Sequence, residues 1–296
     1  MPCFKPLQAY QAASGEVVFY ESSRHDIVRS LSLPCGQCIG CRLERSRKWA
    51  MRCVHEASLY ERNCFITLTY NDEYLPKRSQ LQYSDFQKFL KRLRKFAEPE
   101  VIRFYMCGEY GTENWRPHYH AIIFNFDFLD KVYYRRSPAG EKIFRSDILD
   151  RLWPFGFCSV GSVTFQSAAY VARYCVQKVT GFNARYHYAR KDDDGEYSLV
   201  PEFNKMSLKP GIGAEWLRRF TSDVYPRDFV VVNGVECSPP RYYDKVFSRS
   251  NPVEFEDIQF LRESDGRSRF ADNTPERLAV KEVVQKARIR SLIRSV

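Results

Sequence analysis

Two histidines separated by one residue, His118 and His120, have the side chains and the spacing to bind a metal ion. The stretch 116–124 begins polar and ends in an apolar run rich in β-branched and aromatic residues, which is typical of a strand in a buried sheet. Alternate side chains of a strand share one face, so the imidazoles lie about 7 Å apart. Neutral imidazole binds divalent transition metals and leaves coordination positions open. The alternative is a pair of half-buried histidines bonded to nearby backbone.

A second group of reactive side chains is Tyr170, Tyr174 and Lys178, spaced four residues apart. On the helix predicted for residues 166–178 they share one face. A phenol is a weak nucleophile at neutral pH because its pKa is about 10, but a nearby cation and a metal-polarised phosphate favour its reaction. The alternative is packing of these side chains on the sheet. A helix after the last strand can cover the histidine strand, which favours the catalytic interpretation.

A cysteine cluster precedes these groups, with Cys35, Cys38 and Cys41 spaced by two residues and Cys53 further along. The spacing suggests a structural zinc site, although it is not a standard set of four ligands. Reduced, buried thiols are the preferred interpretation from the spacing alone. The ten cysteines are otherwise scattered and do not suggest a secreted disulfide framework.

The charge and aromatic content indicate a polyanionic partner. The chain of 296 residues has 46 Lys and Arg against 36 Asp and Glu, a net charge of +10, and 15% of its residues are aromatic. Excess positive charge and stacking surface together favour nucleic acid. Four cations open the helix expected from about residue 41 to 60 and are candidates for contacts with DNA phosphates: Arg42, Arg45, Arg47 and Lys48. No apolar run is long enough to span a membrane and no signal peptide is evident, so we expect a soluble, intracellular protein.

The elements that position these groups are predicted between residues 63 and 180. Alternating or continuous apolar residues predict strands, and amphipathic periodicity predicts helices, in the order β-α-β-β-α-β-α. The strands are 63–70, 101–108, 116–124 and 157–163, and the helices are 84–96, 146–153 and 166–178. This order matches an α+β, ferredoxin-like (split βαβ) antiparallel sheet with helices packed on it. We expect a loop insertion at 130–145, while residues 1–34 give no clear periodic signal and are expected to wrap the surface.

Two finer expectations concern the ends of these elements. Ser84 and Gln87 have the spacing of a capping box at the start of their helix, and Phe96 is expected in its core stripe. Glu109 follows the second strand and, if that strand pairs antiparallel with the histidine strand, returns close to His118. We therefore predict Glu109 as the third metal ligand, with a solvent-exposed carboxylate as the alternative.

The chain divides into three predicted segments. Residues 1–62 form a Cys-rich and basic N-terminal segment, residues 63–180 form the core, and residues 181–296 form a C-terminal extension. The extension ends in a basic helix that starts near Thr274 and Pro275.

Three motifs, in order, resemble those of rolling-circle replication initiators of the HUH endonuclease superfamily. They are Phe65–Tyr70, the Gly108-Glu109 and Arg116–His120 stretch, and Tyr170–Lys178. Two tyrosines point to the two-tyrosine branch. The pattern Pro-Cys-Gly-x-Cys-x-Gly-Cys-Arg at 34–42 and Pro-Gly-Ile-Gly at 210–213 are most similar to the replication initiators of gokushovirus-type microviruses, which are small single-stranded DNA phages.

The resemblance implies a mechanism and a site. His118, His120 and Glu109 would hold Mg²⁺ or Mn²⁺, while Tyr170 or Tyr174 attacks the origin of the replicative form and becomes linked to the 5′ phosphate. A 3′-OH is left for synthesis, and the displaced strand is later rejoined into a circle by the other tyrosine. The position between the tyrosines is an arginine, where a lysine is expected equally often. Lys178 is therefore the better candidate for stabilising the charge of the reaction. Arg116 and Arg173 would join the basic residues above in binding DNA.

The resemblance also implies partners and leaves alternatives open. We expect single-stranded DNA at the origin of a double-stranded replicative form as the substrate, a host helicase and polymerase as partners, and the host bacterial cytoplasm as the location. A plasmid initiator or a transposase of the same superfamily shares this chemistry. A non-catalytic module that binds single-stranded DNA or RNA is the alternative from another class, because ferredoxin-like sheets with exposed aromatics also do that.

Overall fold

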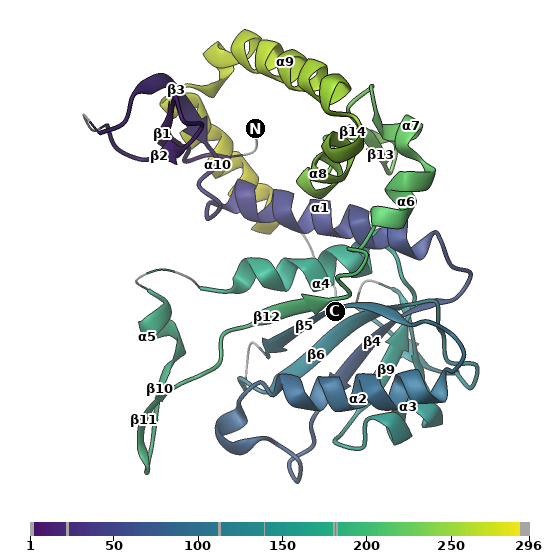
Figure 1. Ribbon diagram of the computed structural model, residues 1–296. Helices are drawn as coiled ribbons and strands as arrows, with labels where there is room; N and C mark the ends of the chain where they lie inside the picture. The colour runs from purple at the N-terminus through teal and green to yellow at the C-terminus, as the bar shows by residue number, and fades with distance from the viewer. Residues whose placement is uncertain are drawn as a thin grey trace. The chain divides into compact units, whose positions relative to one another are not determined.

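The computed structural model describes residues 3–21, 24–111, 114–138, 140–179, 181 and 183–290, with no side chains described for 173–177. The chain forms two compact units (Figure 1). One comprises the residues up to Arg45 together with the segment from Glu256 onward, and the other comprises Ser46–Phe255. The three-segment division with limits at 62 and 180 stays a prediction from the sequence. No helix in the described ranges is long and apolar enough to cross a membrane.

The larger unit is built on a seven-stranded antiparallel sheet, which confirms the predicted α+β class. The strand order is β12-β5-β6-β4-β9-β8-β7. The strand β6 lies between β4 and β5, and β4 lies between β6 and β9. The strands are β4 (Asn63–Thr69), β5 (Arg103–Tyr110), β6 (Pro117–Phe124), β7 (Val132–Arg136), β8 (Lys142–Arg145), β9 (Cys158–Gly161) and β12 (Phe203–Met206). The four predicted core strands are all present.

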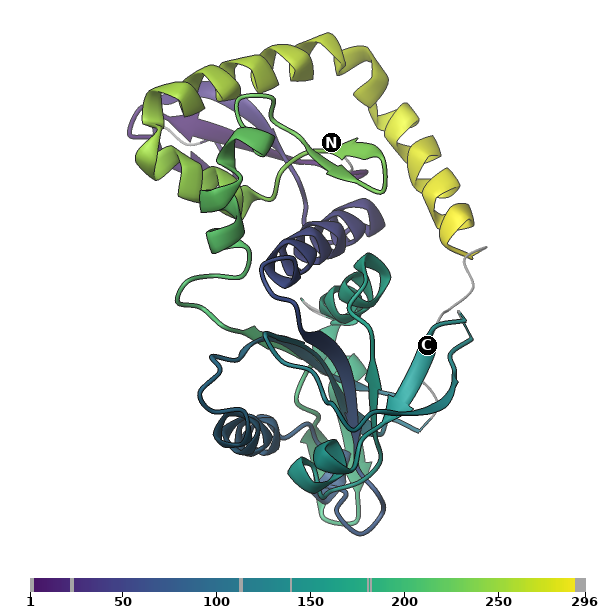
Figure 2. The ribbon, with the colours of Figure 1, turned by 90° about the vertical axis from the view of Figure 1, so that its right-hand side faces the viewer.

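Helices cover both faces of this sheet, and the apolar alternation of the strands explains why. Helices α2 (Tyr83–Phe96) and α3 (Asp147–Leu152) pack on the face that carries Ile66 and Leu68. Helix α4 (Phe165–Gln177) and part of α1 (Ile39–Ala57) pack on the opposite face, against Tyr105, Cys107, Ile122 and Phe124. Figure 2 shows α2 and α4 on opposite sides of the sheet. Because both faces are buried, the central strands β5 and β6 have nearly continuous apolar sequences.

Three expectations for this unit are wrong. Helix α2 begins at Tyr83 after Gln82, whose side chain makes no capping hydrogen bond, so Ser84 is not the cap. Phe96 is 50% exposed because it ends the helix and contacts Phe126 at the edge of the core. Residues 130–145 contain a hairpin rather than a loop, since β-branched and aromatic residues of β7 pair with β8, which itself pairs with β9.

The chain beyond α4 adds small elements to the larger unit. The acidic stretch 192–196 forms the tip of a two-stranded hairpin, and Arg78 Nε donates to Asp192 Oδ2 at 2.6 Å. Arg78 lies in the short helix η1 (Lys77–Ser79). The remaining elements are α5 (Ala184–Tyr188), β10 (Ala189–Asp192), β11 (Gly195–Ser198), α6 (Ala214–Arg219), α7 (Thr221–Val224), β13 (Val230–Val232), β14 (Val235–Cys237) and α8 (Arg241–Ser250).

The smaller unit contains a three-stranded antiparallel sheet of order β2-β1-β3. Residues 1–34, which give no clear periodic signal in the sequence, therefore contain the three strands of this sheet. The strands are short and mix polar with apolar residues, which leaves little periodic signal in the sequence. The final helix is confirmed from Pro275 as far as the described residues extend. The elements are β1 (Leu7–Ala12), β2 (Val17–Val18), β3 (Ile27–Leu33), α9 (Pro252–Ser268), η2 (Phe270–Asn273) and α10 (Pro275–Arg290), with α9 beginning in the larger unit.

Candidate active site

The register between β5 and β6 brings the predicted metal ligands together. Glu109 lies directly opposite His118 in the antiparallel ladder, and Cys107 lies opposite His120. Alternate residues of each strand point to one face, so Glu109, His118 and His120 all project toward the face that α4 covers. A sheet interior is stiff, and these side chains are held there with little freedom to separate.

The three side chains converge on one carboxylate oxygen. Glu109 Oε1 lies 2.6 Å from His118 Nε2 and 2.9 Å from His120 Nε2. The potential ligand atoms of the trio all lie within 4.8 Å of one another. Glu109 and His120 are each 2% exposed, whereas His118 is half-buried at the end of the site. The predicted third ligand is therefore a buried carboxylate rather than a solvated one.

The other nitrogen of each imidazole is held by a neighbouring group. His118 Nδ1 lies 3.1 Å from the carbonyl oxygen of Arg116, which only accepts hydrogen bonds, so Nδ1 carries the proton. His120 Nδ1 lies 2.9 Å from Thr67 Oγ1, which is able to accept in the same way. With the proton of a neutral ring on Nδ1, the Nε2 atom beside Glu109 is the one that could bind a metal in place of its hydrogen bond to the carboxylate. Outer hydrogen bonds of this kind orient histidines that bind metals.

The pKa values of the two histidines shift in opposite directions. Burial lowers the pKa of His118, but its hydrogen bonds and the charge of Glu109 outweigh that effect and raise it above the ordinary value. Burial also lowers the pKa of His120, and there the attraction to Glu109 offsets it only in part, so the pKa stays below the ordinary value. His120 is thus held in the neutral form that binds metals.

The chemistry of this donor set fits a divalent cation. Two imidazole nitrogens and one carboxylate are available, and Glu109 Oε2 is buried without a hydrogen-bond partner among the described residues. A buried carboxylate oxygen without a partner is costly unless a cation or water satisfies it. Mixed nitrogen and oxygen donors suit metals such as Mn²⁺, which keep further positions for water or phosphate. The residues that could hold a metal here are therefore Glu109, His118 and His120.

Helix α4 places Tyr170 beside this site. The helix starts at a capping box in which Thr164 and Ser167 exchange side-chain-to-backbone hydrogen bonds, and it buries Ala168, Val171 and Ala172 against the sheet. The Tyr170 ring is half-buried and meets the His120 ring edge to face, with 5.1 Å between their centroids. A phenol is thus adjacent to an imidazole of the metal-binding trio.

The other predicted catalytic residues are placed differently. The backbone of Tyr174 lies within α4, but its side chain and that of Arg173 lie outside the described residues. Lys178 is the C-cap of α4 with ψ of 120°, so the chain leaves the helix there. The φ of Lys178 is −49°, which is still helical, so its Cα continues the helix predicted for 166–178 and only the chain after it turns away. Its role in catalysis stays a prediction.

The predicted DNA-binding residues fall in several places. Arg116, next to the histidine strand, donates to the carbonyl oxygen of Tyr70 at 3.1 Å and to Asp72 Oδ1 at 2.6 Å. Four of the predicted residues lie along α1: Arg42, Arg45, Arg47 and Lys48. Arg45 is exposed and donates to the Gly36 carbonyl. Arg42 and Arg45 belong to the smaller unit, and Arg47 and Lys48 to the larger one.

Two residues near the predicted sites were missed by sequence reasoning, and one was misassigned. Thr67 contacts His120 only because β4 pairs with β6, and the sequence contains no signal for that register. Cys53 does not join the cysteine cluster, because it is twelve residues beyond Cys41 on the continuous helix α1, a rise of about 18 Å. It is buried among apolar side chains of the larger unit, and Cys3 takes its place in the cluster.

Comparison with known proteins identifies relatives over most of the chain. The family described as replication-associated protein ORF2/G2P matches residues 63–179. The replication-associated protein VP4 of Bdellovibrio phage phiMH2K is 34% identical over 86% of this chain and 80% of the relative. The replication-associated protein ORF2 of Spiroplasma virus 4 is 32% identical over 93% of this chain and 88% of the relative. The replication-associated protein ORF4 of Chlamydia phage 1 is 28% identical over 77% of this chain and 57% of the relative. No solved structure matches the chain.

Proposed function

Because the chain belongs to the family of phage replication-associated proteins, we propose that it starts rolling-circle replication by nicking one DNA strand at a phage origin. The observation that carries this proposal is the position of Tyr170 beside the buried trio of Glu109, His118 and His120. A nucleophile next to a metal-binding group is the minimum needed for phosphoryl transfer. The described part of the chain has no other group that combines a hydroxyl nucleophile with three such ligands.

The strand order supports the HUH endonuclease fold as part of this proposal. Helix α2 joins β4 to β5, and β6 lies between those two strands. Helix α3 lies between β6 and β9 in the chain, and β4 lies between those two strands. Two interlocked split βαβ units are the ferredoxin-like arrangement. That arrangement places the paired histidines on a central strand and the tyrosine helix above them.

In the proposed reaction the Tyr170 hydroxyl loses its proton and the phenolate oxygen attacks the scissile phosphorus. The bond from phosphorus to the 3′ oxygen breaks, and that oxygen takes a proton and becomes the 3′-OH used for synthesis. Mg²⁺ or Mn²⁺ held by Glu109, His118 and His120 would supply stabilisation of the charge on the phosphate oxygens. One phosphodiester is exchanged for another, so a 3′-OH can later attack the phosphotyrosine and rejoin the strand without ATP.

Tyr174 is proposed as the second nucleophile. It is four residues after Tyr170 within α4, a spacing that places both side chains on one helix face. One tyrosine can hold the 5′ end while the other cleaves the regenerated origin, so that the displaced strand is released as a circle. A single nick needs only one tyrosine, whereas circularisation needs both in turn.

The substrate and setting of this proposal follow from charge and family. A net charge of +10 favours a polyanion. The relatives are named replication-associated proteins of phages, so we propose an origin on a double-stranded replicative form, cleaved as single-stranded DNA in the host bacterial cytoplasm. A host helicase and polymerase would then extend the 3′-OH. Arg47, Lys48, Arg116 and Arg173 are proposed to contact the DNA backbone.

The decisive experiment is a denaturing gel of the full chain with end-labelled single-stranded origin DNA and Mn²⁺. We expect a shorter labelled product and a denaturant-stable protein–DNA adduct, both abolished by EDTA. Tyr170→Phe and Tyr174→Phe should each retain some nicking and lose most circularisation, because the remaining tyrosine still acts once. The double variant should bind DNA normally and form no adduct, since phenylalanine keeps the ring and removes only the hydroxyl.

Two outcomes would contradict the proposal. An adduct in the double variant would place the nucleophile elsewhere. Binding without cleavage or adduct under any divalent cation, unchanged by EDTA, would identify a non-catalytic nucleic-acid-binding module instead. Tyr186→Phe is the matched control, because Tyr186 is exposed in α5 outside the site. Removal of its hydroxyl should leave nicking and circularisation unchanged.

A further inference from the structure

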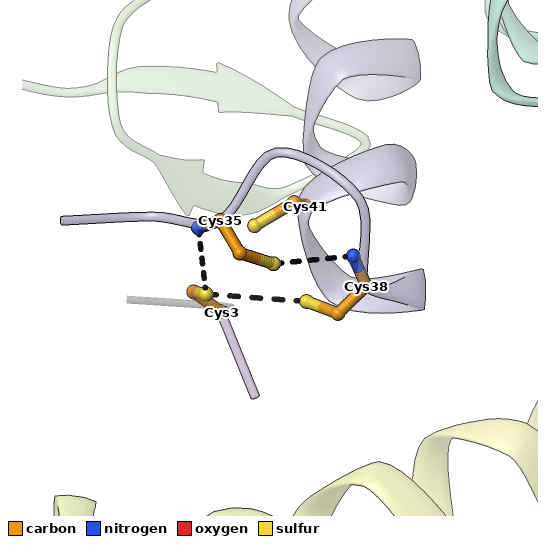
Figure 3. Close-up of side chains that lie close together, drawn as sticks. All are labelled: Cys3, Cys35, Cys38 and Cys41. Carbon is orange, nitrogen blue, oxygen red and sulfur yellow. Dashed lines mark hydrogen bonds between the residues drawn. The ribbon is translucent and has the colours of Figure 1, made fainter. Parts of the chain in front are cut away.

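Four cysteines distant in sequence converge in the smaller unit. Cys3 precedes β1, Cys35 follows β3, Cys38 directly precedes α1 and Cys41 lies in the first turn of that helix. Figure 3 shows their side chains pointing toward one another around a common centre. The four sulfur atoms lie within 4.8 Å of one another, and Cys3 Sγ is 4.0 Å from Cys38 Sγ. All four are free thiols.

These spacings fit a tetrahedral metal site better than disulfides or chance burial. A zinc ion bound by four thiolates at about 2.3 Å requires sulfur–sulfur distances of about 3.8 Å. A disulfide would require about 2.0 Å between two of the sulfurs, well below the Cys3–Cys38 separation. The cluster is also largely shielded from water, with Cys3, Cys38 and Cys41 buried and Cys35 half-buried.

Backbone groups around the sulfurs are arranged to stabilise thiolates. The amide of Phe4 donates to Cys38 Sγ, that of Cys35 to Cys3 Sγ and that of Cys38 to Cys35 Sγ, each at 3.3 Å. Donors directed at sulfur favour its charged form. Gly36, with φ of +73°, provides the left-handed turn that directs the Cys38 amide back to Cys35. Cys38 and Cys41 lie at the N-terminal end of α1, where the helix dipole favours negative charge.

The smaller unit has few other means of stabilising its fold. Among its described residues the buried hydrophobic side chains are Cys3, Ala9, Ala12, Val18, Cys38, Cys41, Ile258 and Leu278. Three of these are cysteines of the cluster and two are alanines, so the apolar core is very small. Small units of this kind are commonly stabilised by disulfides or a structural metal. Here the cluster fastens the residues before β1 and after β3 to the start of α1.

We infer that Cys3, Cys35, Cys38 and Cys41 bind one structural zinc ion as four thiolates. Binding releases the four thiol protons and leaves a centre with net charge −2, which the three amide donors and the helix dipole partly offset. Three of the four predicted ligands, Cys35, Cys38 and Cys41, belong to the cluster, but the fourth ligand is Cys3 rather than Cys53. The site is structural because all four ligands come from the protein and no position is left for substrate.

The test is the zinc content of the full chain, purified without chelators and measured by mass spectrometry of the metals. We expect about one zinc per chain, reduced to near zero in Cys3→Ser. Cys53→Ser, which alters a buried cysteine of the same helix, should retain zinc. His118→Ala should also retain it, which separates this site from the trio of the proposed active site. Unfolding temperature should fall on zinc removal in the wild type but not in Cys3→Ser.

A measurement on the unaltered chain covers the case in which Cys3→Ser does not fold. A thiol-specific mercurial should release the zinc in step with modification of four thiols, and Co²⁺ substitution should give the absorption of a tetrahedral thiolate centre. Wild-type protein without zinc, or zinc that stays in folded Cys3→Ser, would overturn the inference. Loss of zinc from His118→Ala would show that the ion is bound at the other site. A coloured iron centre would show that the cluster binds iron and not zinc. None of these outcomes depends on nicking.

Discussion

Thr67→Val tests whether the hydrogen bond from strand β4 to His120 prepares the proposed metal site. Valine has nearly the shape of threonine and is equally suited to a strand, so the change removes the hydroxyl and little else. Thr67 Oγ1 lies 2.9 Å from His120 Nδ1, and the His120 side chain is almost completely buried. When Nε2 binds a metal, the proton must be on Nδ1, and the valine variant leaves that N–H without its threonine partner.

The expected magnitude follows from burial. Leaving a buried donor without its partner costs about 1–3 kcal/mol. Loss of an outer hydrogen bond to a metal-binding histidine typically lowers metal affinity by about 10- to 100-fold, which corresponds to about 1.4–2.7 kcal/mol. We therefore expect Mn²⁺ to bind Thr67→Val about 10- to 100-fold more weakly, with at most a modest loss of stability.

Isothermal titration of the metal-free chain with Mn²⁺ measures this change without relying on nuclease activity. Thr69→Val is the matched control, because Thr69 lies two residues along β4 opposite His118, but its hydroxyl donates to the Phe157 carbonyl at 2.8 Å. It should keep the wild-type Mn²⁺ affinity. Equal affinity in wild type and Thr67→Val, or an equal loss in both variants, would refute the role of Thr67 in orienting His120.

Two further predictions concern stability. Burial between aromatic rings lowers the pKa of His55 to about 4, while in the unfolded chain it titrates near 6.5, so the free energy of unfolding should fall between pH 6.5 and 4. The contribution lost is about 3 kcal/mol. Urea unfolding of wild type and His55→Gln should show a difference in the free energy of unfolding that narrows at low pH. Parallel plots of that free energy against pH would contradict the prediction. Gly156→Ala should lower the free energy of unfolding by about 1–3 kcal/mol, because the added Cβ would lie 2.5 Å from the Asn71 amide nitrogen. Gly266→Ala, in a helix with open space around it, should gain about 0.5–1 kcal/mol, and similar unfolding midpoints for the two variants would refute the steric argument.

The sequence by itself determined the features that depend on neighbouring residues. Period-two spacing places His118 and His120 on one face of β6 whatever surrounds that strand, and the helical spacing of Tyr170 and Tyr174 is fixed in the same way. The apolar runs of β5 and β6 identify strands buried on both faces, and the alternation of β4 identifies it as a strand as well. Even the position of Glu109 opposite His118 follows from the sequence, because few residues join its strand to the histidine strand and allow only a narrow choice of register.

The tertiary structure decided the features that join segments far apart in the chain. Thr67 reaches His120, and Cys3 reaches Cys38, through strand pairing and packing across 53 and 35 residues, for which a single sequence contains no signal. The hairpin at 132–145 also departed from the local pattern, because β8 pairs with β9 as well as with β7. The reason is physical: a turn or a strand face is specified by adjacent side chains, whereas the register and partner of a strand depend on the free energy of the whole packed unit.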